Sequence, residues 1–238
     1  MRTPILAILA LAVAGCVAPQ PAPVPQPEMP LVGADGRTTP RGAAVQFLQV
    51  VARVEPVAEA VCRQRGVARS CDIRIVVDDR PGMPPNAFQT LDKAGRPVVG
   101  FTLALIADAR NLDELAFVLG HEAAHHIAGH IPKRQEQALS GALVAAVLAQ
   151  AEGLSPEEVR AAQNLGAEAA ARSYSKQFEL EADALGAEIA LLAGYDPVLG
   201  TGFFDRLPNP GDRFLGTHPP NAQRKAQVAA TVRRLMAR

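Results

Sequence analysis

The sequence predicts an α+β fold that is mostly helical and carries one small β-sheet. Apolar residues recur at helical spacing near the start of the globular part and again through its alanine-rich second half, whereas residues 72–103 contain short strand-like segments. Tryptophan is absent and aromatic residues make up 4% of the 238 residues, so the core must be largely aliphatic. The formal net charge is zero, which gives no electrostatic reason to expect a nucleic-acid partner.

The first 40 residues read as appendages to a single domain. Residues 1–15 combine one basic residue, a short apolar run and small residues before Cys16, which are the three parts of a secretory signal. The sequence VAGC that ends at Cys16 resembles the bacterial lipobox, so we expect cleavage and acylation there; an ordinary signal peptide with an incidental cysteine is the alternative. The prolines of residues 16–40 predict an extended tether, and residues 41–238 the globular domain.

Two further features agree with export. Val17, in place of an Asp, resembles lipoproteins sent to the outer membrane of Gram-negative bacteria, so we expect a lipid anchor at its periplasmic face. Setting Cys16 aside leaves Cys62 and Cys71, an even pair in an oxidising compartment. A disulfide between them would contribute roughly 2.5 to 3 kcal/mol in the chain-entropy model. Two buried free thiols are the alternative.

The globular part begins with elements whose ends are marked by glycine and proline. Residues 45–65 have the apolar spacing of an amphipathic helix that stops at Gly66. Segments 72–78, 86–91 and 96–103 are predicted strands, the last two joined by a turn. We therefore expect a small sheet ahead of the next helix.

That next helix, within LAFVLGHEAAHHIAGH at 115–130, holds His121, Glu122 and His125 in the H-E-x-x-H pattern. Positions four apart share a helix face, so both imidazoles can bind one Zn²⁺ while Glu122 reaches a water at the metal as general base. The alternative is a chance match on an alanine-rich helix. Burying such a polar set is costly unless something pairs it, and one zinc ion per chain would do so.

The ends of this helix and its other histidines are also predictable. Residues 111–114 supply cap candidates and Gly129 a stop, so the helix should have four or five turns. His126 and His130 lie about 140° and about 180° around the helix from His121, so neither should share the metal. We expect each to lie behind the metal ligands, on the polar surface or at a helix end.

Two more helices follow. Residues 139–151 are strongly apolar but too few to span a bilayer, so they predict a buried or interfacial helix. Packing against the rest of the protein is one interpretation, and a surface that contacts membrane or a hydrophobic substrate is the other. Residues 155–158 begin another helix, with Ser155 as its cap and acidic residues in its first turn.

A third protein ligand is needed to complete a catalytic zinc site. The metzincin pattern requires Gly seven and His ten residues after the first His, and those positions hold Ala128 and Ile131. A Glu on a later helix remains as the candidate.

Glu179 and Asp183 lie four apart on one helical face that Ala182 and Gly186 keep narrow. A narrow face allows close approach, so Glu179 can reach the metal while Asp183 holds a ligand imidazole through its other nitrogen. Glu181 points elsewhere and is expected in solvent; the alternative is that Glu181 is the ligand.

At this point the chain resembles gluzincin peptidases of metallopeptidase family forty-eight, of the HtpX, BepA and LoiP type. The matching segments lie between roughly residues 45 and 224: Asn86-Ala87-Phe88, 113–115, 121–125, 174–175 and 179–183. The resemblance implies a zincin-type (gluzincin) fold with the sheet beside the active-site helix, zinc bound by Glu179, catalysis by Glu122, and Asn86, Ala87 and Phe88 beside the substrate cleft.

The resemblance also gives meaning to a segment near the end of the chain, where His218-Pro and the downstream Arg224 are similar to a segment of many such peptidases. It implies a catalytic-site position for His218, as a cap on the metal or an oxyanion donor, and a substrate-binding one for Arg224. An ordinary loop histidine is the alternative. Residues 101–106 are an unusual version of the segment before the zinc helix, and we expect no helical repeat domain like that of BepA.

These features together predict a zinc metalloendopeptidase of the bacterial cell envelope that acts on polypeptides. The resemblance implies misfolded envelope proteins as substrates. The alternative is a zinc-binding, chaperone-like or assembly-factor lipoprotein with little turnover, against which the intact Glu122 argues.

Overall fold

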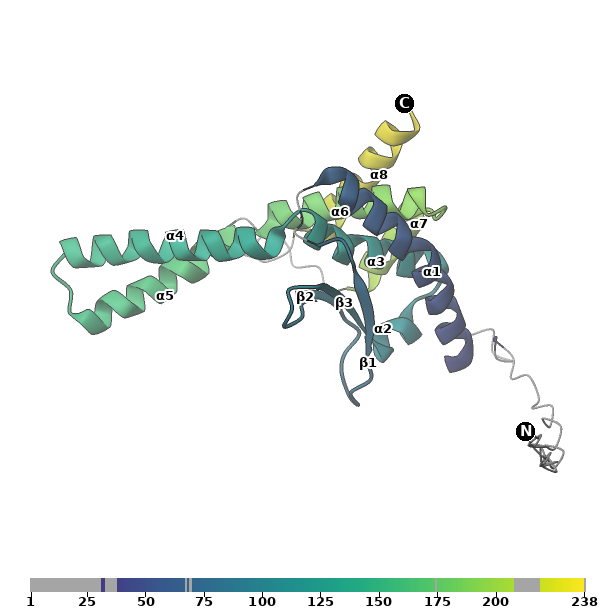
Figure 1. Cartoon of the computed structure of the whole chain (residues 1–238), viewed down its shortest axis with the longest axis horizontal. Coiled ribbons are helices and arrows are strands. Elements are labelled where there is room, and N and C mark those ends of the chain that lie inside the picture. The colour runs from purple at the N-terminus through teal and green to yellow at the C-terminus, as the bar shows by residue number, and fades with distance from the viewer. Residues whose placement is uncertain are drawn as a thin grey trace, which may run out of the picture.

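The structure is a computed structural model that describes residues 31–32, 38–66, 68, 70–173, 175–207 and 219–237. Across these residues helices dominate and three strands form one sheet, which confirms the predicted α+β, zincin-type fold (Figure 1). The signal segment, Cys16, most of the tether and His218 lie outside the described residues. None of the described helices is both long enough and apolar enough to cross a membrane.

Helix α1 (Pro40–Arg65) covers one side of the body. It starts earlier than predicted because Thr39 accepts a hydrogen bond from the backbone of Gly42 and proline occupies the first turn. Gly66 ends it in the left-handed conformation, at φ 64°. A disulfide joins Cys62 to Cys71, with 5.6 Å between their Cα atoms, and so ties the end of α1 to the chain before the sheet.

The sheet contains β1 (Arg74–Asp78), β2 (Ala87–Leu91) and β3 (Pro97–Thr102) in the order β1-β3-β2. Strand β3 is central and entirely buried; it runs parallel to β1 and antiparallel to β2. It ends one residue before the predicted limit because the Thr102 side chain caps α2 (Leu103–Asp108). Strand β2 is left as an edge strand.

Helices α3 (Leu112–Ile127) and α6 (Ser175–Leu192) form the centre of the body. The Asn111 side chain accepts a hydrogen bond from the backbone of Glu114, which fixes the start of α3 as predicted. The two helices touch at Gly120 and Gly186: a Cβ at Gly186 would lie 2.6 Å from the backbone nitrogen of His121. Only glycine permits this approach, and it brings the face of α6 onto the two motif histidines.

Helices α4 (His130–Ala151) and α5 (Pro156–Ser173) form a hairpin that projects from the body (Figure 1). Small residues line their contact. A Cβ at Gly166 would lie 2.4 Å from the carbonyl oxygen of Gly141, so a larger residue there would prevent the close approach. The interpretation that 139–151 pack inside the protein is therefore wrong for its large side chains. Between 56% and 72% of each stays exposed: Leu139, Leu143, Val144, Val147 and Leu148. Contact with membrane or substrate stays a prediction.

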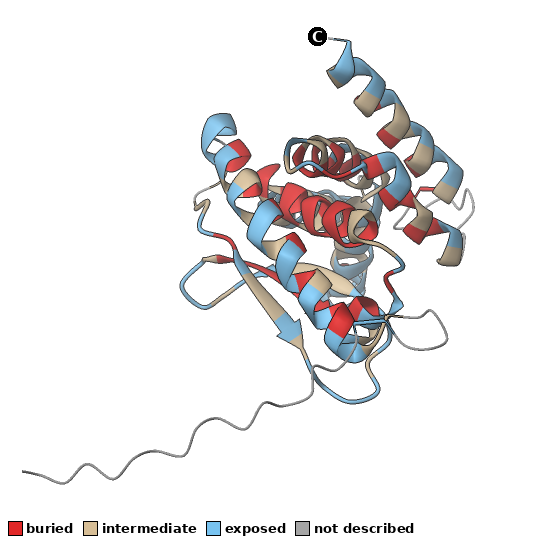
Figure 2. Cartoon of the chain, turned by 90° about the vertical axis from the view of Figure 1, so that its right-hand side faces the viewer, coloured by how far each residue is buried: buried red, intermediate tan, exposed pale blue. Residues whose placement is uncertain are grey.

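The C-terminal part closes the body behind α6. It contains α7 (Pro197–Gly200), the 3-10 helix η1 (Thr201–Arg206) and α8 (Asn221–Met236). Helix α8 packs on α6 and buries Arg224, Val228 and Thr231. Figure 2 shows the buried residues concentrated where the body helices face one another, with outward faces exposed.

Candidate metal centre

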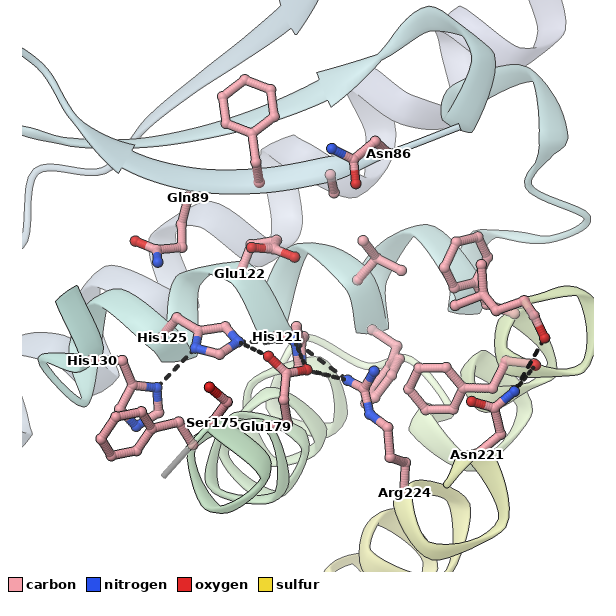
Figure 3. Close-up of a pocket in the computed structure, with 18 of the residues that line it drawn as sticks. Asn86, Gln89, His121, Glu122, His125, His130, Ser175, Glu179, Asn221 and Arg224 are labelled. Atoms are coloured by element: carbon pink, nitrogen blue, oxygen red, sulfur yellow. Dashed lines mark hydrogen bonds and ion pairs between the residues drawn. The ribbon is translucent and has the colours of Figure 1, made fainter. Parts of the chain in front are cut away.

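Three side chains from α3 and α6 converge on one point. Nε2 of His121 and Nε2 of His125 are 3.1 Å apart, and Glu179 places one carboxylate oxygen 3.5 Å from the first and the other 3.3 Å from the second (Figure 3). One ligand atom from each residue lies within 4.8 Å of the others. The structure therefore brings together the three predicted metal ligands.

The far nitrogen of His121 is held by a buried carboxylate. Nδ1 of His121 lies 3.0 Å from Oδ1 of Asp183, as predicted, and Asp183 is fully buried. Burial alone would raise the pKa of Asp183, but Arg224 and His121 outweigh it and lower that pKa. The ionised carboxylate accepts from Nδ1–H, so Nε2 of His121 faces the point where the three side chains converge.

Arg224 completes this side of the centre from α8. Its Nε and Nη2 donate to the two oxygens of Asp183 at 2.8 and 2.6 Å, and Nη2 lies 3.3 Å from Glu179. The guanidinium also stacks over the Phe204 ring, with its central carbon 4.2 Å from the ring centroid. Arg224 lines the cavity, as expected of a substrate-binding residue, and these contacts place its guanidinium beside the ligand atoms, where it also supports Asp183.

The far nitrogen of His125 has a different partner, which was not predicted. Its Nδ1 lies 2.8 Å from Nδ1 of His130, whose Nε2 lies 3.2 Å from Glu181. Burial, and then repulsion by His125, lower the pKa of His130 to about 4. Glu181 is exposed, as predicted, and it contacts His130 rather than the point where the three ligand candidates converge. His126 instead donates from Nε2 to the carbonyl of Ser70.

The side chain of Glu122 lines a cavity of about 820 Å³ beside the metal centre. It lies on the side of the two imidazoles that faces β2, where Asn86 and Gln89 also point toward the site (Figure 3). Ala87 and Phe88 line the same cavity. The Phe88 ring rests on Gly100 of β3, where a Cβ would be 2.2 Å from it, so Phe88 forms the wall rather than reaching the ligands.

Several cavity residues escaped the sequence analysis: Gln89, Phe178, Phe203, Phe204 and Asn221. Gln89 alternates with Phe88 along β2, and this period of two was the available signal for a side chain that faces the helix. The others come from segments whose approach depends on tertiary packing. His218 cannot be placed, because it lies outside the described residues.

The donor set fits a zinc ion. Two imidazole nitrogens and a carboxylate oxygen are the ligands of catalytic zinc sites, which keep a fourth position open. Burial alone would lower the pKa of His121, but Asp183 and Glu179 outweigh it and raise that pKa to about 10, so the surroundings favour a positive charge there. A helix with two histidines and a Glu, met by a Glu from a second helix, defines the class of zinc hydrolase sites.

Comparison with known proteins gives the family. Peptidase family M48 matches residues 48–232, and the chain belongs to that family, which confirms the resemblance to metallopeptidase family forty-eight. The chain is also similar to the mitochondrial metalloendopeptidase OMA1 of Arabidopsis thaliana, with 31% identity over 140 residues. The match covers 57% of this chain and 27% of the relative, so the chain spans about a quarter of that protein.

Proposed function

We propose that this protein is a zinc metalloendopeptidase that hydrolyses peptide bonds within polypeptides. One observation carries the proposal: His121, His125 and Glu179 converge on a single point, and Glu122 stands beside that point in the same cavity. Membership of a peptidase family and the similarity to a metalloendopeptidase support the same activity.

The metal ion and the residues around it have different roles in the hydrolysis. A bound Zn²⁺ would supply Lewis acidity toward the peptide carbonyl and acidify a water at the site. Glu122 takes a proton from the attacking water and passes it to the leaving amine, which is why a carboxylate must stand next to the ligands without being one. Asp183 and Arg224 keep His121 oriented while these steps occur.

The edge strand β2 supports a polypeptide substrate. Strand β3 occupies one edge of β2, and no other described strand pairs with its opposite edge. The start of this strand runs along the cavity wall, which is lined by Asn86, Ala87 and Phe88. An extended peptide can pair with such an edge through its backbone, which binds it with little dependence on sequence.

We further propose that the protein acts in the bacterial envelope, anchored by acylated Cys16 at the periplasmic face of the outer membrane, on misfolded envelope proteins. The signal-like residues 1–15 support export, and the disulfide between Cys62 and Cys71 fits an oxidising compartment. Labelled palmitate should enter wild type and not Cys16→Ser, and the latter should become soluble. A Ser variant that stays membrane-bound would contradict the anchor.

The activity is tested by comparing wild type with Glu122→Gln on an unfolded casein substrate. The Gln variant should keep one zinc per chain, because Glu122 is not a ligand, and lose at least about 10²-fold in kcat. Equal turnover by both proteins would overturn the assignment.

The exposed aliphatic face of α4 favours one second candidate, a zinc-binding chaperone-like protein that holds unfolded chains with little turnover. Wild type that prevents aggregation of a denatured substrate without cleaving it, and does so equally as Glu122→Gln, would favour this candidate.

A further inference from the structure

His130 lies directly behind the ligand His125 and is 1% exposed. Its Nδ1 is 2.8 Å from Nδ1 of His125, and its Nε2 is 3.2 Å from Oε2 of Glu181. Its ring stacks on Phe178 of α6, with centroids 4.4 Å apart and planes inclined by 18°. Contacts on three sides therefore fix both the position and the orientation of this imidazole.

The backbone between α3 and α4 delivers the ring to this place. Helix α3 ends at Ile127, Gly129 adopts φ 70°, and α4 begins at His130. Glycine enters this left-handed conformation at little cost, whereas other residues are strained there. The chain therefore changes direction within two residues, and the ring of His130 turns back toward the end of the helix that it follows.

The two polar contacts of His130 determine which nitrogen of His125 carries a proton. An ionised carboxylate only accepts, so Glu181 requires the N–H of His130 to be at Nε2. A neutral imidazole has one N–H, so Nδ1 of His130 is then an acceptor, and His125 must donate to it from Nδ1. Nε2 of His125 then has a free lone pair, directed at the point where His121, His125 and Glu179 converge. This is the tautomer of His125 that can bind a metal ion through Nε2.

We propose that His130 is a positioning residue of the metal centre, which holds His125 in the tautomer and orientation in which Nε2 binds the metal. Glu181 fixes the tautomer of His130 in turn. Asp183 contacts Nδ1 of His121 directly. Nδ1 of His125 contacts His130 instead, and His130 in turn contacts the carboxylate of Glu181. The inference rests on the proposed zinc site and adds a function for two residues outside the ligand set.

The first test measures zinc affinity by competition with a chromophoric chelator at one pH. His130→Phe keeps a ring to stack on Phe178 but removes both nitrogens, whereas His130→Gln keeps one acceptor and one donor. His126→Phe is the matched control, since its imidazole bonds to the Ser70 carbonyl away from the ligands. We expect His130→Phe to weaken zinc binding about 10- to 100-fold, His130→Gln to restore part of this loss, and His126→Phe to stay near wild type.

A purely structural role would give another pattern. It would lower the melting temperature of the metal-free His130→Phe protein without changing the zinc affinity or the visible spectrum of the cobalt-loaded protein. We expect that spectrum to change, because the orientation of His125 about the metal is no longer fixed. Equal zinc affinities and equal cobalt spectra for His130→Phe and His126→Phe would overturn the proposal.

A second measurement needs no variant and holds even if His130→Phe fails to fold. In zinc-loaded wild type with ¹⁵N-labelled histidine, a scalar coupling should connect Nδ1 of His125 with Nδ1 of His130 across their shared hydrogen. Coordination of His125 through Nδ1, or no coupling between these nitrogens, would overturn the inference and leave the peptidase proposal intact. Wild type that binds no zinc would overturn both.

Discussion

Two pairs of described helices meet with a glycine on each partner, and only one of these two pairs is covered on its outer side. Gly120 and Gly186 bring α3 and α6 together, and Gly141 and Gly166 do the same for α4 and α5. The first pair lies inside the body and carries the metal ligands, whereas the second projects with its large aliphatic side chains exposed (Figure 1).

The comparison separates two consequences of close helix packing. In α3 and α6 it positions chemistry, because the approach at Gly186 brings Glu179 and Asp183 onto the histidines of α3. In α4 and α5 the small residues occupy the contact, so the large residues of α4 must lie on its outer face. Four substitutions test this distinction, from the largest expected effect to the smallest.

Gly186→Ala should damage the metal centre most. The added Cβ would lie 2.6 Å from the backbone nitrogen and 2.8 Å from Cα of His121, so α6 must move away and take Glu179 with it. We expect zinc affinity to fall about 100-fold or more, together with a lower melting temperature. Gly202→Ala is the matched control, since its Cβ meets only a Glu114 side-chain oxygen at 3.4 Å. Equal zinc affinities in the two variants would contradict the packing argument.

Leu119→Ala should lower the free energy of unfolding by about 2 to 5 kcal/mol, because the side chain is 1% exposed within the body and its removal leaves a cavity. Urea denaturation of the metal-free protein measures this cost. A loss below about 1 kcal/mol would show that the core of α3 can collapse around the missing atoms.

Gly166→Ala should destabilise the hairpin by about 1 to 3 kcal/mol and leave zinc binding unchanged. Its Cβ would lie 2.4 Å from the Gly141 carbonyl oxygen, but the ligands are on α3 and α6. Amide hydrogen exchange in α4 and α5 detects the loosening, and chelator competition gives the affinity. A fall in zinc affinity like that of Gly186→Ala would show that the two helix pairs are not independent.

Leu143→Ala should change the free energy of unfolding by no more than about 0.5 kcal/mol. Its side chain is 66% exposed on the outer face of α4, and both residues are good helix formers. The same urea experiment as for Leu119→Ala makes the two leucines comparable. A cost near that of Leu119→Ala would mean that α4 is covered by another surface in solution.

The sequence predicted those parts of the fold that depend on local chemistry. Asn111 and Gly66 act as helix ends whatever surrounds them, so the start of α3 and the end of α1 were found correctly. The convergence of His121, His125 and Glu179 was also predictable, because spacing along a helix decides which side chains share a face.

Two features were not predictable, for different physical reasons. The sequence placed His130 outside the ligand set but did not indicate its contact with His125, because its angle was extrapolated along α3, whereas α3 ends at Ile127 and Gly129 redirects the chain. For the aliphatic residues of 139–151 the sequence left burial and surface contact both open, because apolar spacing indicates a face and not what covers it. The glycine and alanine contacts of the hairpin decide that, and they depend on α5.

The hairpin also bears on the order in which the chain folds. It leaves and rejoins the body at the cavity, where Arg134 of α4 and Arg172 of α5 both line the wall. Holding α3 and α6 together through about 50 flexible residues would cost about 3.5 kcal/mol of closure entropy, against about 1.5 kcal/mol for a loop of about five. Neighbouring helices form from short-range contacts and form fast. A hairpin that folds first would therefore shorten the loop and lower the entropic cost of bringing the metal ligands together.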